Sequence, residues 1–214
     1  MYKTGMLVAA VTGALLVSAS YAHAGVIDHE TFKGTFAFAN FSIDTSETCA
    51  DGTSGTLNTF VNVSGSQSRT SSRMFPSESL DSVSVDVETV DSCTGLATLV
   101  FGQVSGGFTP STTRTATLNA TVPLVDDLGN SAGTATVALT LKRTIITSVF
   151  NDHTKETQLD TGTGTLTVQE HESGKSAEAT AAGSLVVNGV QFIGGFTGGG
   201  IVQDSSGSVD IQKK

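Results

Sequence analysis

Three histidines lie outside the N-terminal segment, and their side chains are the best candidates for chemistry in this chain: His29, His153 and His171. A zinc site built from histidines needs three imidazoles to converge on one ion. His29 lies close to the expected mature N-terminus, where chains are usually mobile. His153 and His171 lie in or beside successive polar segments, which would place them at opposite ends of one strand pair. We therefore expect no metal site and no cofactor.

Neighbouring carboxylates suggest a second role for two of these histidines. Glu170 and Glu172 flank His171, but neighbours in a strand alternate between faces, so the glutamates would point away from the imidazole. Asp152 precedes His153 and could orient its ring for general-base catalysis. No GxSxG nucleophile elbow accompanies this pair. We therefore favour solvated loops at both positions and keep a hydrolase or lyase using His153 or His171 as the least favoured function.

Asp126, Asp127 and Asn130 place three oxygen ligands in one short segment, and oxygen is the ligand type that calcium prefers. The segment lacks the spacing of an EF-hand loop and its bidentate glutamate. Asp and Asn are also ordinary turn formers, because their side chains hydrogen-bond to nearby backbone groups. We expect a hairpin turn here and keep weak calcium binding as the alternative.

Cys49 and Cys93 are the two cysteines of the chain. In an oxidising compartment a lone pair of cysteines most often forms one disulfide. Each is followed by turn residues, so the bond would join two loops or strand ends. The lack of a CxxC motif argues against a metal or redox pair. Closing a stretch of about 45 residues would stabilise the fold by roughly 4 kcal/mol through the entropy of the unfolded chain.

Period-two alternation of apolar and polar residues is the main structural pattern, and it predicts strands with one buried face. Short polar segments containing Gly, Asn or Asp separate the alternating runs, as in hairpins. We therefore predict four antiparallel strands in a meander between Arg114 and Val187. Within this region the alternating runs span residues 116–124, 135–141 and 165–169, an Ala-rich stretch spans residues 176–187, and the expected loops span residues 126–131, 151–156 and 171–175. A further alternating run spans residues 83–87.

The flanking segments are less regular. Residues 35–43 change phase in mid-run, at Ala39 and Asn40, which indicates a bulge or a strand bend. Residues 64–78 have the composition of an exposed loop after a strand at 56–63. Residues 96–101 are largely apolar and predict a strand covered on both faces. Asn188 and Gly189 predict a type I′ turn, and residues 201–211 a weak last strand. Together these segments predict an all-β fold of about nine or ten antiparallel strands, as a β-sandwich or a closed β-barrel.

The first 24 residues have the pattern of a cleaved secretory signal, expected to be helical. Lys3 precedes an apolar stretch over residues 6–17, and Ala22 and Ala24 stand at the positions that a signal peptidase inspects. The stretch is too short to span a bilayer core of about 30 Å. We expect residues 25–214 to be one secreted domain, extracellular or periplasmic, without a transmembrane segment.

Composition argues against several classes of partner. The chain carries 11 Lys and Arg against 20 Asp and Glu, a formal net charge of −9, so nucleic-acid binding is disfavoured. Trp is absent, and both tyrosines, Tyr2 and Tyr21, lie in the expected signal. This composition argues against sugar binding by stacking on Trp or Tyr faces.

We expect a secreted, non-enzymatic β-domain that acts as a structural, adhesive or surface-associated binding module, with a cell-surface or extracellular-matrix partner. In its content of Gly, Thr and Ser, its lack of Trp and its single cysteine pair, the chain resembles secreted pilin-type and other bacterial adhesive subunits. One alternative is a β-barrel that carries a small ligand in an interior lined by some of its 11 Phe residues. The other is the secreted hydrolase or lyase considered above.

Overall fold

The computed structural model describes residues 28–72, 77–112, 114–160, 164–192 and 194–213. The expected signal over residues 1–24 lies outside these ranges. The regular elements of the described part are all β-strands, which confirms the all-β prediction. Within the same ranges the structure contains no helix with the length and apolar character that a membrane span requires.

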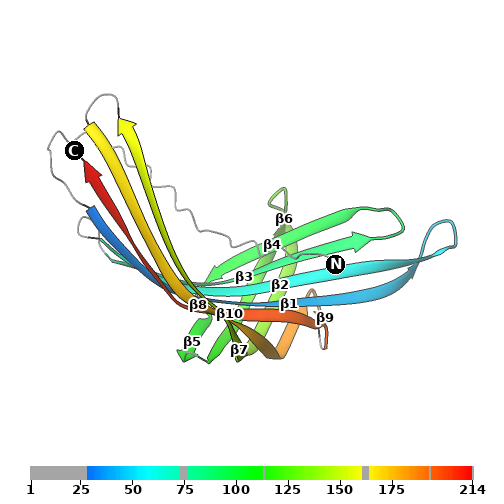
Figure 1. Cartoon of the computed structure of the whole chain (residues 1–214). Helices are drawn as coiled ribbons and strands as arrows, with labels where there is room; N and C mark the ends of the chain where they lie inside the picture. Colours follow the sequence, from blue (N-terminus) through cyan, green and yellow to red (C-terminus); the bar gives the residue numbers. More distant parts are fainter. Residues whose placement is uncertain (1–27, 73–76, 113, 161–163, 193, 214) are drawn as a thin grey trace.

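Ten strands make up the described part of the chain, and every pairing between them is antiparallel (Figure 1). This arrangement follows from the alternating sequence, because strands with one apolar face must share a buried core. In chain order the strands are β1 (Asp28–Thr48), β2 (Ser54–Ser72), β3 (Glu78–Asp91), β4 (Ala97–Ser105), β5 (Phe108–Thr112), β6 (Thr115–Asp126), β7 (Ser131–Asp160), β8 (Gly164–Val187), β9 (Val190–Gln191) and β10 (Phe196–Lys213).

Eight of these strands close into a barrel in the order β1–β2–β3–β4–β6–β7–β8–β10. The ring closes because β10 pairs with both β8 and β1. The short strands β5 and β9 are additions to the ring and pair with β6 and β8, respectively. Of the two predicted architectures, the closed barrel is therefore the one observed.

The shortest ladder in the ring of eight strands joins β4 and β6. These strands, both described throughout, pair directly at two positions, Val100–Asp126 and Phe101–Val125. Further along, β6 pairs with β5 instead. Pro123 lies in the interruption between the two pairings and has no backbone N–H to donate to a neighbouring strand.

Alternate residues of the barrel strands point inward and form one apolar core. The packing is tight where Phe108 covers Gly65, because a Cβ atom at Gly65 would collide with the Phe108 ring. Such close packing leaves little room for voids around these side chains. The largest fully buried side chains are Phe108, Leu118, Leu124, Leu141, Leu185, Ile201, Val61, Val63, Val83, Val85, Val122 and Val137.

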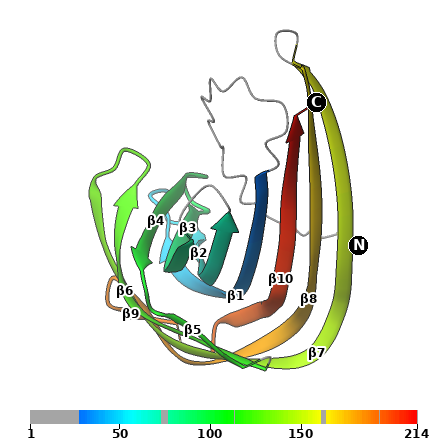
Figure 2. The ribbon, with the colours of Figure 1, turned by 90° about the vertical axis from the view of Figure 1, so that its left-hand side faces the viewer.

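Long strands continue past the barrel body as an extension, which we define as residues 28–35, 67–72, 149–160, 164–175 and 203–213. The outer parts of β1, β7, β8 and β10 rise together from the barrel (Figures 1 and 2). Where β1 leaves the barrel, the phase that buries Ala39 and Ala37 continues as Thr35, Lys33 and Thr31. The face that is the apolar interior of the barrel thus becomes a polar face on the extension.

The predicted loops at residues 151–156 and 171–175 are wrong, because both segments are strand and pair with each other across β7 and β8. The β7–β8 ladder instead continues to the pair Asp160 and Gly164. The region from Arg114 to Val187 therefore holds three long strands, not four short ones. Similarly, residues 64–72 continue β2 instead of starting a loop. Ladder pairing with neighbouring strands has outweighed the local turn preference of these polar residues.

The predicted change of phase over residues 35–43 is also wrong. Ala37, Ala39 and Phe41 are all buried, so β1 keeps one phase. The partner strand β10 holds an extra residue opposite Asn40 and Phe41, and a second register shift with an extra β10 residue lies between Gly34 and Phe36. The bulge was therefore correctly expected in this part of the barrel but belongs to β10.

Two further predictions concern the burial of β4 and the turn before β9. β4 forms as expected, but one of its faces is open, with Leu99 51% and Phe101 41% exposed. The turn at Asn188 and Gly189 is confirmed, since their φ angles are 49° and 82°. Positive φ at both central residues is the geometry of a type I′ turn.

Candidate functional site

His153 and His171 lie side by side on the extension. They are direct partners in the β7–β8 ladder, so their side chains share one face of the sheet. Their ring centroids are 4.3 Å apart and the ring planes are inclined by 36°. The expectation that these histidines lie at opposite ends of a strand pair is therefore wrong. It fails because residues 151–156 and 171–175 are strand, not loop.

The two imidazoles differ in their surroundings. The side chain of His153 is exposed, whereas that of His171 is partly covered. The Nδ1 atom of His171 is enclosed and has no hydrogen-bond partner among the described residues. An enclosed polar atom without a partner typically destabilises a fold by about 1–3 kcal/mol.

The other residues that the sequence links to this pair are His29 and the neighbouring carboxylates. The backbone of His29 pairs with Asp210 in the β1–β10 ladder, and Ser208, two residues from Asp210, pairs with His171. The third histidine is therefore two strands away from the pair along the sheet. The side chains of Asp152, Glu170 and Glu172 lie outside the described residues.

The extension carries the polar continuation of the barrel interior, which we call the extension face. Apart from the exposed Val149, its described residues alternate hydroxyl and amide side chains with cations, and most of them are exposed. The described members are Thr31, Lys33 and Thr35 of β1, Gln67, Arg69 and Ser71 of β2, Val149, Asn151 and His153 of β7, and His171, Ser173 and Lys175 of β8. None of these is a carboxylate, although the chain as a whole is acidic.

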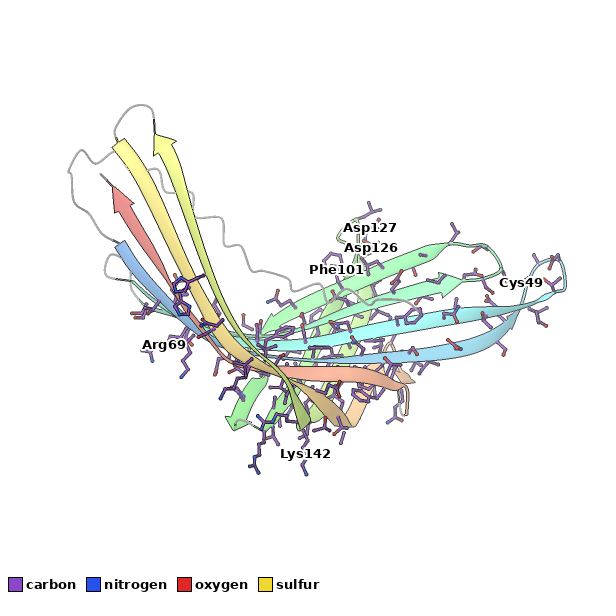
Figure 3. The ribbon with its side chains drawn as sticks, viewed as in Figure 1. Cys49, Arg69, Phe101, Asp126, Asp127 and Lys142 are labelled. Carbon is purple, nitrogen blue, oxygen red and sulfur yellow. A yellow bond between two sulfur atoms is a disulfide. The ribbon has the colours of Figure 1, made fainter. Side chains whose placement is uncertain are left out.

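Two cations of the extension face are direct neighbours. Lys33 and Arg69 are opposite partners in the β1–β2 ladder, and both side chains are exposed. Within the described residues neither has an ion-pair partner. Two described carboxylates of β3 lie near Arg69. Glu78 is opposite Thr70 and therefore on the other face, whereas Asp81 is opposite Gln67 on the same face and accepts a hydrogen bond from the backbone N–H of Phe108 at 3.2 Å. Figure 3 places Arg69 at the base of the extension.

The disulfide between Cys49 and Cys93 is confirmed, with the two Cα atoms 5.3 Å apart. It lies at the end of β1 and β2 farthest from the extension (Figure 3). The sulfurs occupy the space next to Gly55, where a Cβ atom would collide with them. A disulfide, together with the lack of a membrane-spanning helix among the described residues, is compatible with a secreted or periplasmic protein.

An open cleft of about 550 Å³ lies beside the disulfide, lined by Ser46, Glu47, Thr48, Ser54, Gly55, Thr56 and Ser92. Carboxyl oxygens of Glu47 and Asp91 approach the Cys93 sulfur to within 4.8 Å, a grouping of potential metal ligands. The Cys93 sulfur is not available as a thiolate, however, because it is bonded to Cys49. The grouping therefore reduces to a pair of carboxyl groups.

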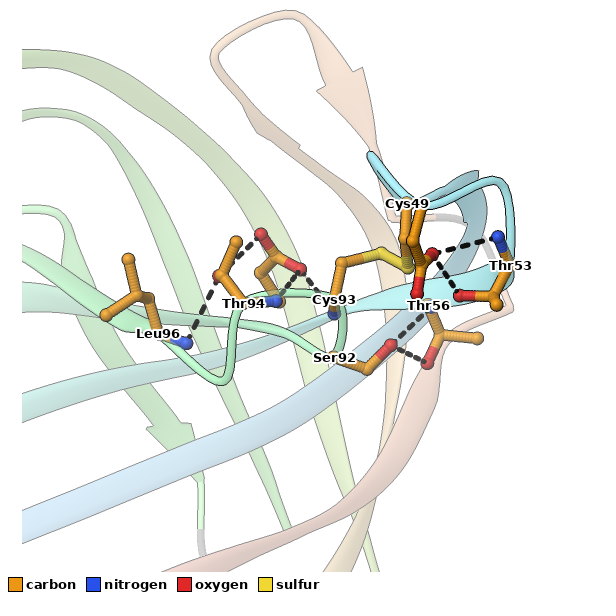
Figure 4. Close-up of a disulfide and its surroundings, with 9 residues drawn as sticks. Cys49, Thr53, Thr56, Ser92, Cys93, Thr94 and Leu96 are labelled. Carbon is orange, nitrogen blue, oxygen red and sulfur yellow. Dashed lines mark hydrogen bonds between the residues drawn. A yellow bond between two sulfur atoms is a disulfide. The ribbon is translucent and has the colours of Figure 1, made fainter.

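The two carboxyl groups have opposite pKa shifts. Hydrogen bonds from the Thr94 hydroxyl and from the backbone N–H groups of Thr94 and Cys93 lower the pKa of Asp91, whose oxygens cap the turn after β3. Figure 4 shows Cys93 and Thr94 in this turn, next to the disulfide. Partial burial and the adjacent Asp91 raise the pKa of Glu47. The Asp91 oxygens already accept hydrogen bonds from the turn residues. The Glu47–Asp91 pair therefore does not form an open cation site.

The segment Asp126–Asn130 forms the turn that the sequence predicts. Asp126 accepts hydrogen bonds from the backbone N–H groups of Leu128 and Asn130 and from the Asn130 side chain. The hydrogen bonds from Asn130 are the main reason why the pKa of Asp126 is lowered. Since both carboxylate oxygens serve the turn, the geometry favours a hairpin over calcium binding.

The extension face and the Glu47–Asp91 pair were not identified from the sequence. The pattern that could have found the face is the alternation of β1, because Thr31, Lys33 and Thr35 stand in phase with the buried Ala37. Nothing in the sequence places Arg69 beside Lys33, because that contact depends on the β1–β2 register.

Comparison with known proteins gives weak similarities. No protein-family model matches the sequence, and no curated protein matches it significantly. An enduracididine biosynthesis enzyme of known structure is similar at 8% identity over 86% of this chain and 87% of its own, with a TM-score of 0.30. An acetoacetate decarboxylase-like enzyme from Sphingomonas wittichii RW1 is similar at 8% identity over 87% and 91%, with a TM-score of 0.25. Similarities at this level carry no argument about this chain.

Proposed function

We propose that this chain is a secreted, non-enzymatic binding module whose extension face binds an anionic polysaccharide. The observation that carries the proposal is the opposed pair Lys33 and Arg69, which has no described ion-pair partner. Like charges directly opposite each other in a sheet destabilise it. An anion bound between them would remove this repulsion and give the arrangement a function.

The chemistry of the surrounding side chains favours a polysaccharide over other polyanions. Hydroxyl and amide groups such as those of Thr35, Gln67 and Asn151 alternate with the cations along the face. A polymer with sugar hydroxyls and carboxylates or sulfates can use both kinds of partner, because hydroxyls hydrogen-bond and Arg binds anions in bidentate fashion. Recognition of this kind does not need Trp and Tyr faces, which residues 25–214 lack.

Affinity measurements with defined polymers test the proposal. We expect binding to alginate or heparin, which weakens with added salt, and no binding to neutral dextran. Exposed ion pairs contribute about 0.2–1 kcal/mol each, so the double variant K33Q/R69Q should bind roughly 2- to 30-fold more weakly. The matched control K142Q/R114Q removes two exposed cations elsewhere, and it should bind like the unmodified chain.

Three results would contradict the proposal. Equal losses in the two double variants would mean that only net charge matters. Binding to polyglutamate as tight as to alginate would point to acidic peptides instead of glycans. Turnover on hydrolase or lyase substrates that disappears in H153A/H171A, with unchanged stability, would make the protein an enzyme.

The small-ligand barrel is compatible with the fold but is less well supported. The described interior is filled by apolar side chains, as at Gly65 and Phe108. A carried lipid or pigment would need space that close packing removes. Native mass spectrometry of the purified chain distinguishes the two functions, because a bound apolar molecule would favour the carrier.

A further inference from the structure

We propose that His153 and His171 together form a binding site for a divalent transition-metal ion such as Zn²⁺ or Cu²⁺. The site lies on the extension face, but the inference does not depend on polysaccharide binding. It rests on the cross-strand register, the distance between the rings and the enclosed nitrogen of His171.

The register gives the pair the geometry that a chelate needs. Residues directly opposite in an antiparallel ladder have Cβ atoms about 4.5–5.5 Å apart on the same face. With ring centroids 4.3 Å apart, small rotations of the two side chains can direct one nitrogen of each ring at a common point. Bonds from zinc to imidazole nitrogen are about 2.0–2.1 Å long, so an ion fits between two rings at this separation.

The enclosed Nδ1 atom of His171 supplies a second, independent observation. It has no hydrogen-bond partner among the described residues. Neutral imidazole nitrogen is the commonest metal ligand in proteins, and bonding to an ion would satisfy this atom. Stacking of the two rings alone would leave it without a partner.

The surroundings fit a partly open site. Two protein ligands leave the remaining positions of a tetrahedral ion to water or to an added ligand. On β7, Lys155 is two residues from His153, and its side chain lies outside the described residues. The nearest cation on β8, Lys175, is four residues from His171, which is about 13 Å along a strand. At physiological ionic strength its repulsion at an exposed face is largely screened over this distance.

Metal titration of the full chain, produced without a histidine tag, tests the site. Isothermal titration with Zn²⁺ should show one ion per chain, and H153A and H171A should each weaken its binding about 10-fold or more, since each removes one of two protein ligands. With Cu²⁺ as the probe, pulsed paramagnetic resonance should detect two coordinated imidazoles in the unmodified chain and one in each variant.

The control N151A/S173A changes the next cross-strand pair on the same face and should leave Zn²⁺ affinity unchanged. Unchanged affinity in both histidine variants, or equal loss in the control, would overturn the proposal. If H171A disturbs the fold, the exposed His153 allows the same test through H153A alone. Polysaccharide binding by these variants is measured separately, so failure of one proposal does not decide the other.

Discussion

Replacing Cys49 and Cys93 together by serine removes a crosslink from the unfolded chain. The bond spans a sequence separation of 44 residues, for which the loop-entropy relation gives about 4 kcal/mol at 25 °C. The folded barrel does not need the bond to bring these segments together, because the β1–β2 and β2–β3 ladders already end beside them. We therefore expect nearly the whole effect to arise in the unfolded state.

Urea unfolding followed by circular dichroism measures this effect. With a urea dependence of about 2 kcal/mol per molar, a loss of about 4 kcal/mol lowers the midpoint by about 2 M. Amide chemical shifts should change near the Cys49 end of the barrel and remain constant on the extension. A loss below about 1 kcal/mol, or shifts that spread to the extension, would refute the unfolded-state explanation.

Three further predictions concern packing and ionisation. Gly65→Ala forces a methyl group against the Phe108 ring and should lower the free energy of unfolding in urea by about 1–3 kcal/mol. Asp126→Asn should lower stability near neutral pH. The pKa of Asp126 in the folded chain is below its ordinary 3.8. The stability difference between Asp126→Asn and the unmodified chain should therefore shrink as the pH falls below 3.8 and vanish below the folded pKa. Glu47→Gln should raise stability near neutral pH and have no effect in acid, because the raised folded pKa of Glu47 makes its ionised form unfavourable.

Each of these three predictions has a control variant or an outcome that would contradict it. Gly198 has open space where a Cβ atom would lie, so Gly198→Ala should change stability by less than about 1 kcal/mol. If it destabilises as much as Gly65→Ala, crowding is not the cause. A constant difference between Asp126→Asn and the unmodified chain down to acid pH would exclude an ionic contribution. A destabilised Glu47→Gln at neutral pH would show that the charge is favourable.

The barrel strands were predictable where alternation and burial agree. Val83, Val85 and Val87 are all buried on one face of β3, as their spacing indicates. On the extension the inner phase becomes polar, so strand and loop have similar composition there. His153 and His171 illustrate the failure, because their environment is polar in both states and only pairing decides between them.

The site depends on register, which short-range patterns do not determine. The bulges between Arg143 and Ile145 and between Ile146 and Ser148 shift the β7–β8 pairing before it reaches the histidines. Each bulge moves the partner by one residue and would change which side chains face each other. The pairing of Cys49 with Cys93 was predictable, because only one disulfide is possible with two cysteines.

The interruption between β4 and β6 gives the barrel a preferred place for local unfolding. Fewer backbone hydrogen bonds must break there than at any ladder of the long strands, such as β7–β8. Amide protons at this junction should therefore exchange with solvent before those of β2 and β3. When the junction separates, it presents two unpaired strand edges, and a neighbouring molecule could add its own strand by backbone pairing.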